Sequence, residues 1–555
     1  MAMNRLMSRQ TAQSLSSTTK RALTNKTVHP PERRIFSKTR IFTTAAVIAS
    51  CAAAYTTYSR PEATVPSFPS PGTPSSATQH FPFTTSAPQL RDKEHHMLEV
   101  DEVKEKLNAN ANVYKVGRGK GVWRYDVAQI GANDPIEDDL ALVVVDAPVG
   151  NGDWMFFGTF DGHSGWYTSD LLRKALVPYV SKELGDLYKK TPQPVSSAID
   201  RAISRGFTKL DDDIVMNSVA RVFKNPKWDA RDAQAMLLPA LSGACGMLSF
   251  YNTETRTLKV ALAGDCRAVL GYRDATTGQW KTRALTVDQQ GSNPDEEKRV
   301  RAEHPGEPDV IRRGRMLGNL EPSRAFGDAK YKWSLETQVK LYRGGLGKPP
   351  HPLLKTPPYV TARPEITTVE LSENEKDAFL IMVTDGLTWT LSNNDMVELV
   401  GTWLDKQKPK SSPATESSWV ASFRNPFSRA KPVEAPKILN DPNDERGRPG
   451  IEKLPFTYVD DNAAVHLCRN ALGGAKAEGR WVEQLLSMPA PLARQWRDDM
   501  TATVVFFGEG DGKVTGGTER EGAGRGHGEV IPKAKFRVDS VQVFAKLMIV
   551  QKGRD

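Results

Sequence analysis

Acidic residues stand beside apolar, strand-like runs at widely separated places in the sequence. Five of them are candidate metal ligands: Glu137, Asp138, Asp161, Asp385 and Asp498. A strand that ends in a carboxylate can aim a hard oxygen ligand at a divalent cation. A single Asp-Gly pair would predict only a turn. Several such residues, recurring after apolar runs, predict a metal site.

The chemistry of such a site follows from the repulsion between its carboxylates. If the five converge, they cannot all stay ionised without cations, and two Mg²⁺ or Mn²⁺ ions would neutralise them. The carbonyl of Gly162 is a natural further ligand, because glycine lets the main chain come close. Paired metals lower the pKa of a bridging water and hold phosphoryl oxygens in line for attack. We expect Asp161 to be the bridging ligand.

Four further residues lie in or near these motifs, and their roles are less certain from their types alone. His163 either protonates the leaving group or makes a structural hydrogen bond at the turn. Asp265 and Asp328 are expected to cap turns and fix the neighbouring backbone rather than to ligate metal. Arg324 is expected to pair with one of these two aspartates.

Composition narrows the class of protein. The net charge is +9, but the first sixty residues hold ten basic residues against one acidic residue, Glu32, so the rest is close to balanced. No basic patch interleaved with aromatic residues indicates nucleic-acid binding. The four cysteines show no CxxC spacing, so neither a zinc site nor a disulfide framework is expected. Cys245 and Cys266 lie in apolar runs and are predicted to be buried thiols.

The ends of the chain have compositions unlike the middle. Residues 1–40 are typical of a mitochondrial presequence, the alternative being a disordered basic tail. Residues 41–58 carry no charge and are either a stop-transfer anchor in the inner membrane or the apolar part of a cleaved signal. An anchor would favour the intermembrane space over the matrix. A disordered linker is expected at 59–94, a catalytic domain at 95–510 with a flexible insertion at 405–455, and a tail at 511–555.

Hydrophobic patterning predicts strands and helices in separate runs, which favours packed sheets covered by helices. The predicted strands are Leu140–Val145, Trp154–Phe160, Gly246–Tyr251, Leu258–Ala263, Ala268–Tyr272, Phe379–Thr384 and Ala502–Phe507. The predicted helices are Ser164–Leu184, Pro194–Val219, Glu296–Glu303, Asn394–Leu404 and Ala463–Ala471.

Seven short motifs follow one another along the chain. They are Glu-Asp at 137–138, Asp-Gly-His-Ser-Gly at 161–165, Ser-Gly-Ala-Cys at 242–245, Gly-Asp-Cys-Arg at 264–267, Ser-Arg-Ala-Phe-Gly-Asp at 323–328, Asp-Gly at 385–386 and Arg-Asp-Asp at 497–499. In this order, over roughly residues 115–508, they resemble the metal-dependent serine/threonine protein phosphatases, the PPM or type 2C family. Stretches at 133–138, 329–334, 356–365 and 461–471 are similar to the mitochondrial pyruvate dehydrogenase phosphatase branch.

The resemblance implies an α+β fold, a four-layer αββα sandwich of two antiparallel sheets with a two-metal site at one edge. It implies ligation by Asp161, the Gly162 carbonyl, Asp385 and Asp498, with Glu137 and Asp138 acting largely through metal-bound waters. Two departures matter. Asn133 stands where many relatives have a phosphate-binding arginine. Ala240 and Trp389 stand near where other branches have aspartates for a third metal, so we expect only two ions.

Three hypotheses for function follow. The leading one is hydrolysis of phosphoserine and phosphothreonine in a phosphorylated protein by a metal-activated water, with pyruvate dehydrogenase as the substrate that the branch implies. The second is an inactive scaffold of the same fold that binds mitochondrial phosphoproteins or kinases. The third is a phosphatase of small phosphate esters. The chain shows no histidine or cysteine nucleophile motif for a covalent mechanism.

Overall fold

The structure is a computed structural model that describes residues 97–508, apart from 117–120, 226, 228, 373–374, 408–455, 475–479 and 491. The chain divides into two units, Met1–Pro69 and Ser70–Asp555, and every described residue belongs to the second. The predicted presequence, the 41–58 segment, the linker, the insertion from residue 408 onward and the tail lie outside the described residues. Within the described residues, no helix has the length and apolar character needed to span a membrane.

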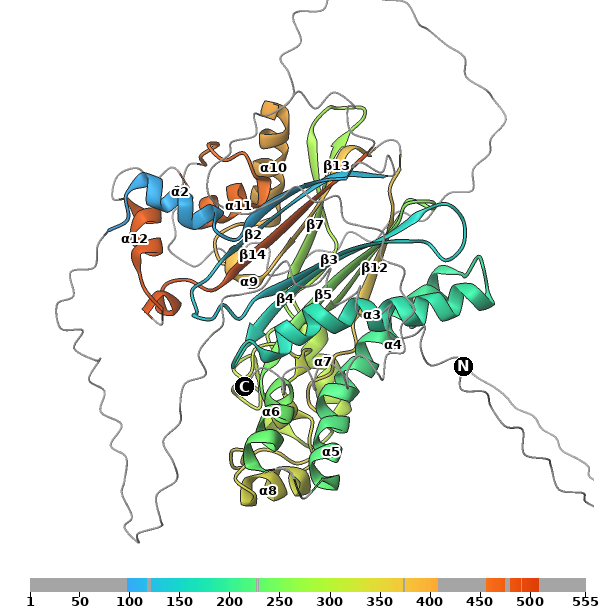
Figure 1. Cartoon of the computed structure of the whole chain (residues 1–555), viewed down its shortest axis with the longest axis vertical. Helices are drawn as coiled ribbons and strands as arrows, with labels where there is room; N and C mark the ends of the chain where they lie inside the picture. The colour runs from blue at the N-terminus through green and yellow to red at the C-terminus, as the bar shows by residue number, and fades with distance from the viewer. Residues whose placement is uncertain are drawn as a thin grey trace, which may run out of the picture. The chain divides into compact units, whose positions relative to one another are not determined.

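Two six-stranded sheets form the centre of the described structure, and their strand pairs are antiparallel (Figure 1). The first sheet has the order β1 (Ala111–Lys115), β2 (Val122–Ile130), β14 (Met500–Phe507), β13 (Glu375–Val383), β7 (Arg267–Asp274) and β8 (Trp280–Ala284). The second has the order β12 (Glu365–Glu370), β6 (Thr257–Ala263), β5 (Gly243–Asn252), β4 (Asp153–His163) and β3 (Asp139–Asp146), with β11 (Phe326–Gly327) paired to β5. A small separate hairpin joins β9 (Ile311–Arg312) and β10 (Arg315–Met316).

Helices cover the outer face of each sheet (Figure 1). Those on the first sheet are α2 (Val100–Asn108), α10 (Asn393–Gln407), α11 (Ala463–Ala471) and α12 (Trp481–Ser487). Those packed on or beyond the second are α3 (Tyr167–Lys190), α4 (Ser196–Asp212), η3 (Asp213–Asn217), α5 (Ser218–Lys224), α6 (Ala230–Leu241) and α8 (Leu335–Arg343). The remaining helical segments are α7 (Pro294–Glu303), η4 (Pro308–Val310), η5 (Ala329–Tyr331), α9 (Asp385–Thr388) and η6 (Leu492–Gln495).

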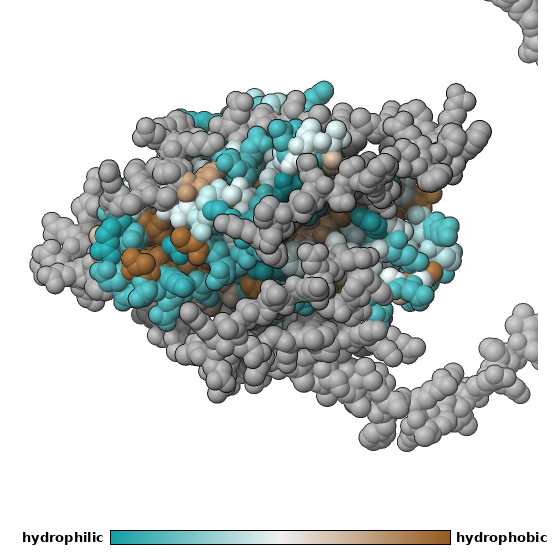
Figure 2. All heavy atoms as spheres, turned by 90° about the horizontal axis from the view of Figure 1, so that it is seen from above, coloured by the Kyte–Doolittle hydropathy of each residue, from teal (hydrophilic) through white to brown (hydrophobic). Residues whose placement is uncertain are grey.

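Alternation along the strands builds the layers. On β13, Phe379, Ile381 and Val383 face the helices of the first sheet, whereas Leu380 and Met382 face the space between the sheets. Successive side chains of a strand point to opposite faces, so a continuous apolar run is buried on both sides. The coloured part of the surface in Figure 2 is largely hydrophilic or neutral, with only small hydrophobic patches. The predicted fold class, two antiparallel sheets flanked by helices, is confirmed.

All seven predicted strands and all five predicted helical regions form, and most of them have shifted ends. The predicted helix Pro194–Val219 starts at Ser196 and contains a π-helical turn, η3, before it continues as α5. Helix α10 extends to Gln407, so residues 405–407 belong to a helix and not to the predicted insertion. Cys245 and Cys266 are buried free thiols, as predicted.

Candidate metal centre

Four chain segments bring the predicted acidic residues to one edge of the two sheets. They are the β2–β3 connection with Glu137 and Asp138, the end of β4 with Asp161, the β13–α9 junction with Asp385, and the segment just before β14 with Asp498. The backbone N–H of Asp385 lies 3.5 Å from Oδ2 of Asp161. A Cβ built on Gly386 would lie 3.1 Å from the Cβ of Asp498. Carboxylates from both sheets are therefore neighbours.

Asp138 is the most deeply buried of the five, with 1% of its surface exposed. Its Oδ2 accepts hydrogen bonds of 2.8 Å from the hydroxyls of Thr384 and Thr501. These threonines extend the β13–β14 ladder, since the Thr384 N–H donates to the Thr501 carbonyl at 3.1 Å. Residues at the ends of β13 and β14 in the first sheet therefore hold the carboxylate of Asp138, which directly precedes β3 of the second sheet.

Burial and mutual repulsion both disfavour the ionised form of the carboxylates at this site. Desolvation raises the pKa of Asp161 and of Asp385 well above the usual range, and the neighbouring carboxylates raise both further. Desolvation also raises the pKa of Asp138 well above its usual range, and the charges of Asp499 and Asp498 add to this. Such a cluster is stable when ionised only if cations neutralise it. Its oxygen ligands suit Mg²⁺ or Mn²⁺ rather than zinc.

Gly162 lies where no side chain fits. A Cβ at this position would come within 2.2 Å of the Glu137 carbonyl oxygen and 2.9 Å of the Ser169 hydroxyl. That hydroxyl donates to the same Glu137 carbonyl at 2.5 Å, and the Glu137 carboxylate accepts from the Gly165 N–H at 2.7 Å. The glycine therefore lets the end of β4 pack directly against the acidic connection.

His163 contacts a carboxylate from another motif. Its Nε2 lies 2.6 Å from Oδ2 of Asp328, whose own backbone N–H donates to the Ser242 carbonyl at 2.8 Å. Burial alone would lower the pKa of His163, but Asp328 raises it above its ordinary value. Asp328 therefore orients a site side chain as well as fixing backbone. A Cβ on Gly243 would lie 2.2 Å from His163 Nε2, so this strand position must also be glycine.

The expected pairing of Arg324 is wrong. Its guanidinium binds Glu296 at 2.5 Å and Glu365 at 2.8 Å, and neither Asp265 nor Asp328 is its partner. Asp265 instead accepts from the Cys245 thiol at 2.9 Å and from the side-chain amide of Gln290 at 3.1 Å. It fixes neighbouring side chains close to the site.

Sequence reasoning missed the role of Asp499, which positions the acidic connection. Its Oδ1 accepts from the N–H groups of Ala132 and Asn133 at 2.5 and 2.9 Å. Its Oδ2 accepts from the Asn133 side-chain amide at 3.0 Å and from the Glu137 N–H at 2.8 Å. The paired aspartates at 498–499 were the only signal, and they did not distinguish a ligand from a positioning residue.

A second missed residue, Arg494, lies at the rim. Its Nη1 forms an ion pair with Oδ2 of Asp498, four residues further along the chain. Desolvation raises the pKa of Asp498, and the charge of Arg494 acts against this. Nothing in the local sequence separates Arg494 from an ordinary surface arginine.

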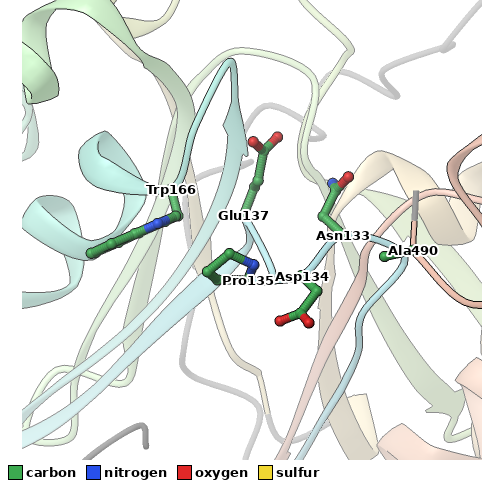
Figure 3. A pocket seen from close by; sticks show the side chains of 6 residues that line it. All are labelled: Asn133, Asp134, Pro135, Glu137, Trp166 and Ala490. Carbon is green, nitrogen blue, oxygen red and sulfur yellow. The ribbon is translucent and has the colours of Figure 1, made fainter. Parts of the chain in front are cut away.

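A pocket of about 290 Å³ opens beside the acidic connection. Figure 3 shows the side chains of Asn133 and Glu137 extending in the same direction, while the Asp134 carboxylate points the other way. Trp166 and Ala490 lie on opposite sides of this connection (Figure 3). Of the five predicted acidic residues, Glu137 lines this pocket.

The residues fit hard cations that keep much of their water. Within the described ranges, no three His, Cys, Asp or Glu side chains are already placed to ligate one ion. Mg²⁺ commonly binds through only one or two carboxylates, with waters and substrate phosphate as its other ligands. The carboxylates of Asp161, Asp385 and Asp498 and the main-chain carbonyl of Gly162 are oxygen donors of this kind.

Comparison with known proteins gives a consistent result. The protein phosphatase 2C family model matches residues 131–420. A protein phosphatase 2C homolog of Schizosaccharomyces pombe is 42% identical over 393 residues, covering 70% of this chain and 81% of its own. The mitochondrial pyruvate dehydrogenase (acetyl-transferring) phosphatase 1 of Saccharomyces cerevisiae is 40% identical, covering 74% and 73%. Human mitochondrial pyruvate dehydrogenase (acetyl-transferring) phosphatase 2 is 30% identical, covering 75% and 84%.

Proposed function

Because the chain belongs to the protein phosphatase 2C family and is a metal-dependent protein serine/threonine phosphatase, we propose that it dephosphorylates pyruvate dehydrogenase in mitochondria. The names of two relatives, one 40% and one 30% identical over about three quarters of the chain, support this substrate. The basic, Ser- and Thr-rich first forty residues support the location.

We propose two Mg²⁺ or Mn²⁺ ions held by Asp161, the Gly162 carbonyl, Asp385 and Asp498, with Glu137 and Asp138 acting through water. When bound, such ions supply Lewis acidity and a nucleophile at neutral pH. The single observation that carries this proposal is the contact between Asp161, at the end of β4, and Asp385, at the end of β13.

Side chains of the protein then position the acidic connection and supply a proton. Asp499 holds the acidic connection in place through four hydrogen bonds, so that Glu137 faces the pocket. His163, oriented by Asp328, is the group that would give a proton to the departing serine or threonine oxygen. Asp328 raises the pKa of His163 above its ordinary value, which favours the protonated ring.

Activity of the full chain tests the mechanism. Wild type and Asp161→Asn would be given a phosphoserine peptide with Mn²⁺ and then with EDTA. We expect turnover only by wild type and only with metal. Activity that survives EDTA, or that Asp161→Asn leaves intact, would contradict the two-metal mechanism, and no turnover at all would favour the scaffold.

A second assay tests the substrate. Phosphorylated pyruvate dehydrogenase, an unrelated phosphoprotein and p-nitrophenyl phosphate would be compared by kcat/KM. We expect the highest value for phosphorylated pyruvate dehydrogenase. Equal values for the two proteins would refute this choice of substrate, and a preference for the small ester would refute action on proteins.

A further inference from the structure

The guanidinium of Arg494 is the feature of the site that the proposed function does not use. It lies on η6, in the segment that also carries Ala490 at the pocket wall. The arginine side chain is 41% exposed, whereas its partner Asp498 is 12% exposed. A half-exposed cation therefore reaches inward from the rim to a carboxylate that we assign to metal binding.

The surrounding charges leave Arg494 few other partners. Besides Asp498, the carboxylates that most raise its pKa against the effect of burial are Asp385 and Asp499. Both oxygens of Asp499 already accept two hydrogen bonds each. Asp385 lies against Asp161 and belongs to the same ligand set.

Other polar groups close to the pocket are less suited to bind an anion. The Asn133 amide is neutral and donates to Asp499. Arg497 is buried, with 3% of its surface exposed, and donates to the carbonyls of Leu485 and Gly131. Lys330 is exposed, and its charge acts on His163 and Asp328.

We propose that Arg494 exchanges partners and binds the phosphoryl group of the substrate. This inference rests on the proposed function. Divalent cations on Asp498 would cancel the charge that holds the guanidinium and would repel it. A phosphate ester then offers the nearest anion, and its oxygens match the planar, forked donors of arginine. Without metal, the same guanidinium partly neutralises the carboxylate cluster.

The test compares full-length wild type with Arg494→Gln, Arg494→Lys and two controls. Arg301→Gln removes a guanidinium that is also 41% exposed and also pairs with a carboxylate four residues away, Glu297, but lies on α7 outside the site. Lys330→Gln removes another exposed cation whose charge acts on His163 and Asp328. Circular dichroism and a melting curve check that each variant folds.

The first readout is affinity for phosphate. We expect Arg494→Gln to raise KM for a phosphoserine peptide, and Ki for inorganic phosphate, about tenfold or more, since a charge-assisted hydrogen bond contributes on that scale. Arg494→Lys should recover part of the loss, because it keeps the charge without the fork. Arg301→Gln should match wild type. Unchanged KM and Ki in Arg494→Gln, or a larger loss in Lys330→Gln, would overturn the proposal.

The second readout needs no activity. Calorimetric titration with Mn²⁺ alone should give Arg494→Gln an affinity higher than that of wild type, because a competing cation has been removed from Asp498. Weaker Mn²⁺ binding in Arg494→Gln would contradict the exchange of partners. An inactive wild type that nevertheless binds Mn²⁺ would refute the phosphatase function while leaving this comparison valid. If wild type is active but Arg494→Gln shows none of the expected changes, only the role of Arg494 is refuted.

Discussion

At the scale of single residues, Gly162 shows how closely the site is packed. Because Gly162 has no side chain, the carbonyl oxygen of Glu137 can pack against its Cα. A Cβ at this position would lie only 2.2 Å from that oxygen. We predict that Gly162→Ala displaces the acidic connection and lowers kcat at least tenfold. Gly185→Ala is the matched control, because no atom lies within 4 Å of the Cβ it would add.

The control variant Gly185→Ala should have the opposite effect on stability and no effect on activity. Gly185 lies inside α3, where replacing glycine by alanine stabilises a helix by roughly 0.5–1 kcal/mol. We therefore expect Gly185→Ala to raise the melting temperature slightly and to keep full activity. Equal kcat for Gly162→Ala and wild type would show that the close contact at β4 is unimportant.

Asp499 acts on the site through the backbone. Asp499→Asn replaces an acceptor oxygen by an amino group that faces N–H donors, which leaves buried donors unpaired. We predict a loss of about 3 kcal/mol in the free energy of unfolding, together with a lower kcat. Urea unfolding and steady-state kinetics measure both. A variant that loses activity but keeps its stability would indicate that Asp499 is a metal ligand instead.

At the scale of elements, Glu296 on α7 anchors the segment that carries Arg324. It is 4% exposed, and its oxygens bind Arg324 and Arg299 and accept from the Ser323 hydroxyl. Burial alone would raise its pKa, but these partners lower it from 4.5 to about 2. A carboxylate with a depressed pKa stabilises the fold above its unfolded pKa, and loses that contribution as the pH falls through the folded value.

We therefore predict that Glu296→Gln destabilises the protein by about 3 kcal/mol at pH 7. The difference from wild type should be the same at pH 7 and pH 5.5, and should shrink only below about pH 4.5, as the unfolded carboxyl becomes protonated. Glu297→Gln, at an exposed ion pair, should change stability by less than about 1 kcal/mol. Urea unfolding across this pH range checks the prediction. A difference that vanishes between pH 7 and 5.5 would contradict it.

The elements differ in how well the sequence predicted them. The helix Ala463–Ala471 forms with the predicted ends, because Asn462 caps it by accepting from the N–H groups of Ala464 and Val465. Strand β2 was missed, because Arg124 and Asp126 interrupt its apolar pattern. These two side chains form an ion pair at 2.6 Å on the same strand, and Asp126 is fully buried, which the sequence pattern does not indicate.

The residues of the candidate site also differ in how well the sequence predicted them. Residue types and strand ends sufficed to select Asp161 and Asp385, because a carboxylate after an apolar run is visible locally. The partners of Asp499 were not predictable, since its contact with Glu137 joins positions 362 residues apart. The ion pair of Arg494 with Asp498 was equally hidden, because an arginine four residues before an acid is common on any surface.

At the scale of the whole molecule, the site joins the two sheets. Asp161 belongs to the second sheet, whereas Asp385 and Asp498 flank strands of the first. Divalent cations should therefore stabilise the sandwich. We predict that saturating Mn²⁺ raises the melting temperature of wild type, since a ligand at 100 times its Kd adds roughly 2.7 kcal/mol.

Asp385→Asn should stabilise the metal-free protein and remove most of its stabilisation by Mn²⁺. It removes one charge from a cluster that raises the pKa of its own members, so the metal-free variant should melt above metal-free wild type. Mn²⁺ should then raise its melting temperature little or not at all. Differential scanning calorimetry with and without Mn²⁺ measures both effects. A metal-free variant less stable than wild type would indicate that Asp385 has a mainly structural role.

The central claim is that carboxylates from both sheets together bind a pair of hard cations. Calorimetric titration of the full chain with Mn²⁺ tests it most directly, because it counts sites without needing a substrate. We predict two equivalents bound per chain of wild type, and loss of at least one in Asp161→Asn. No saturable binding, or the same stoichiometry and affinity in Asp161→Asn, would contradict the account.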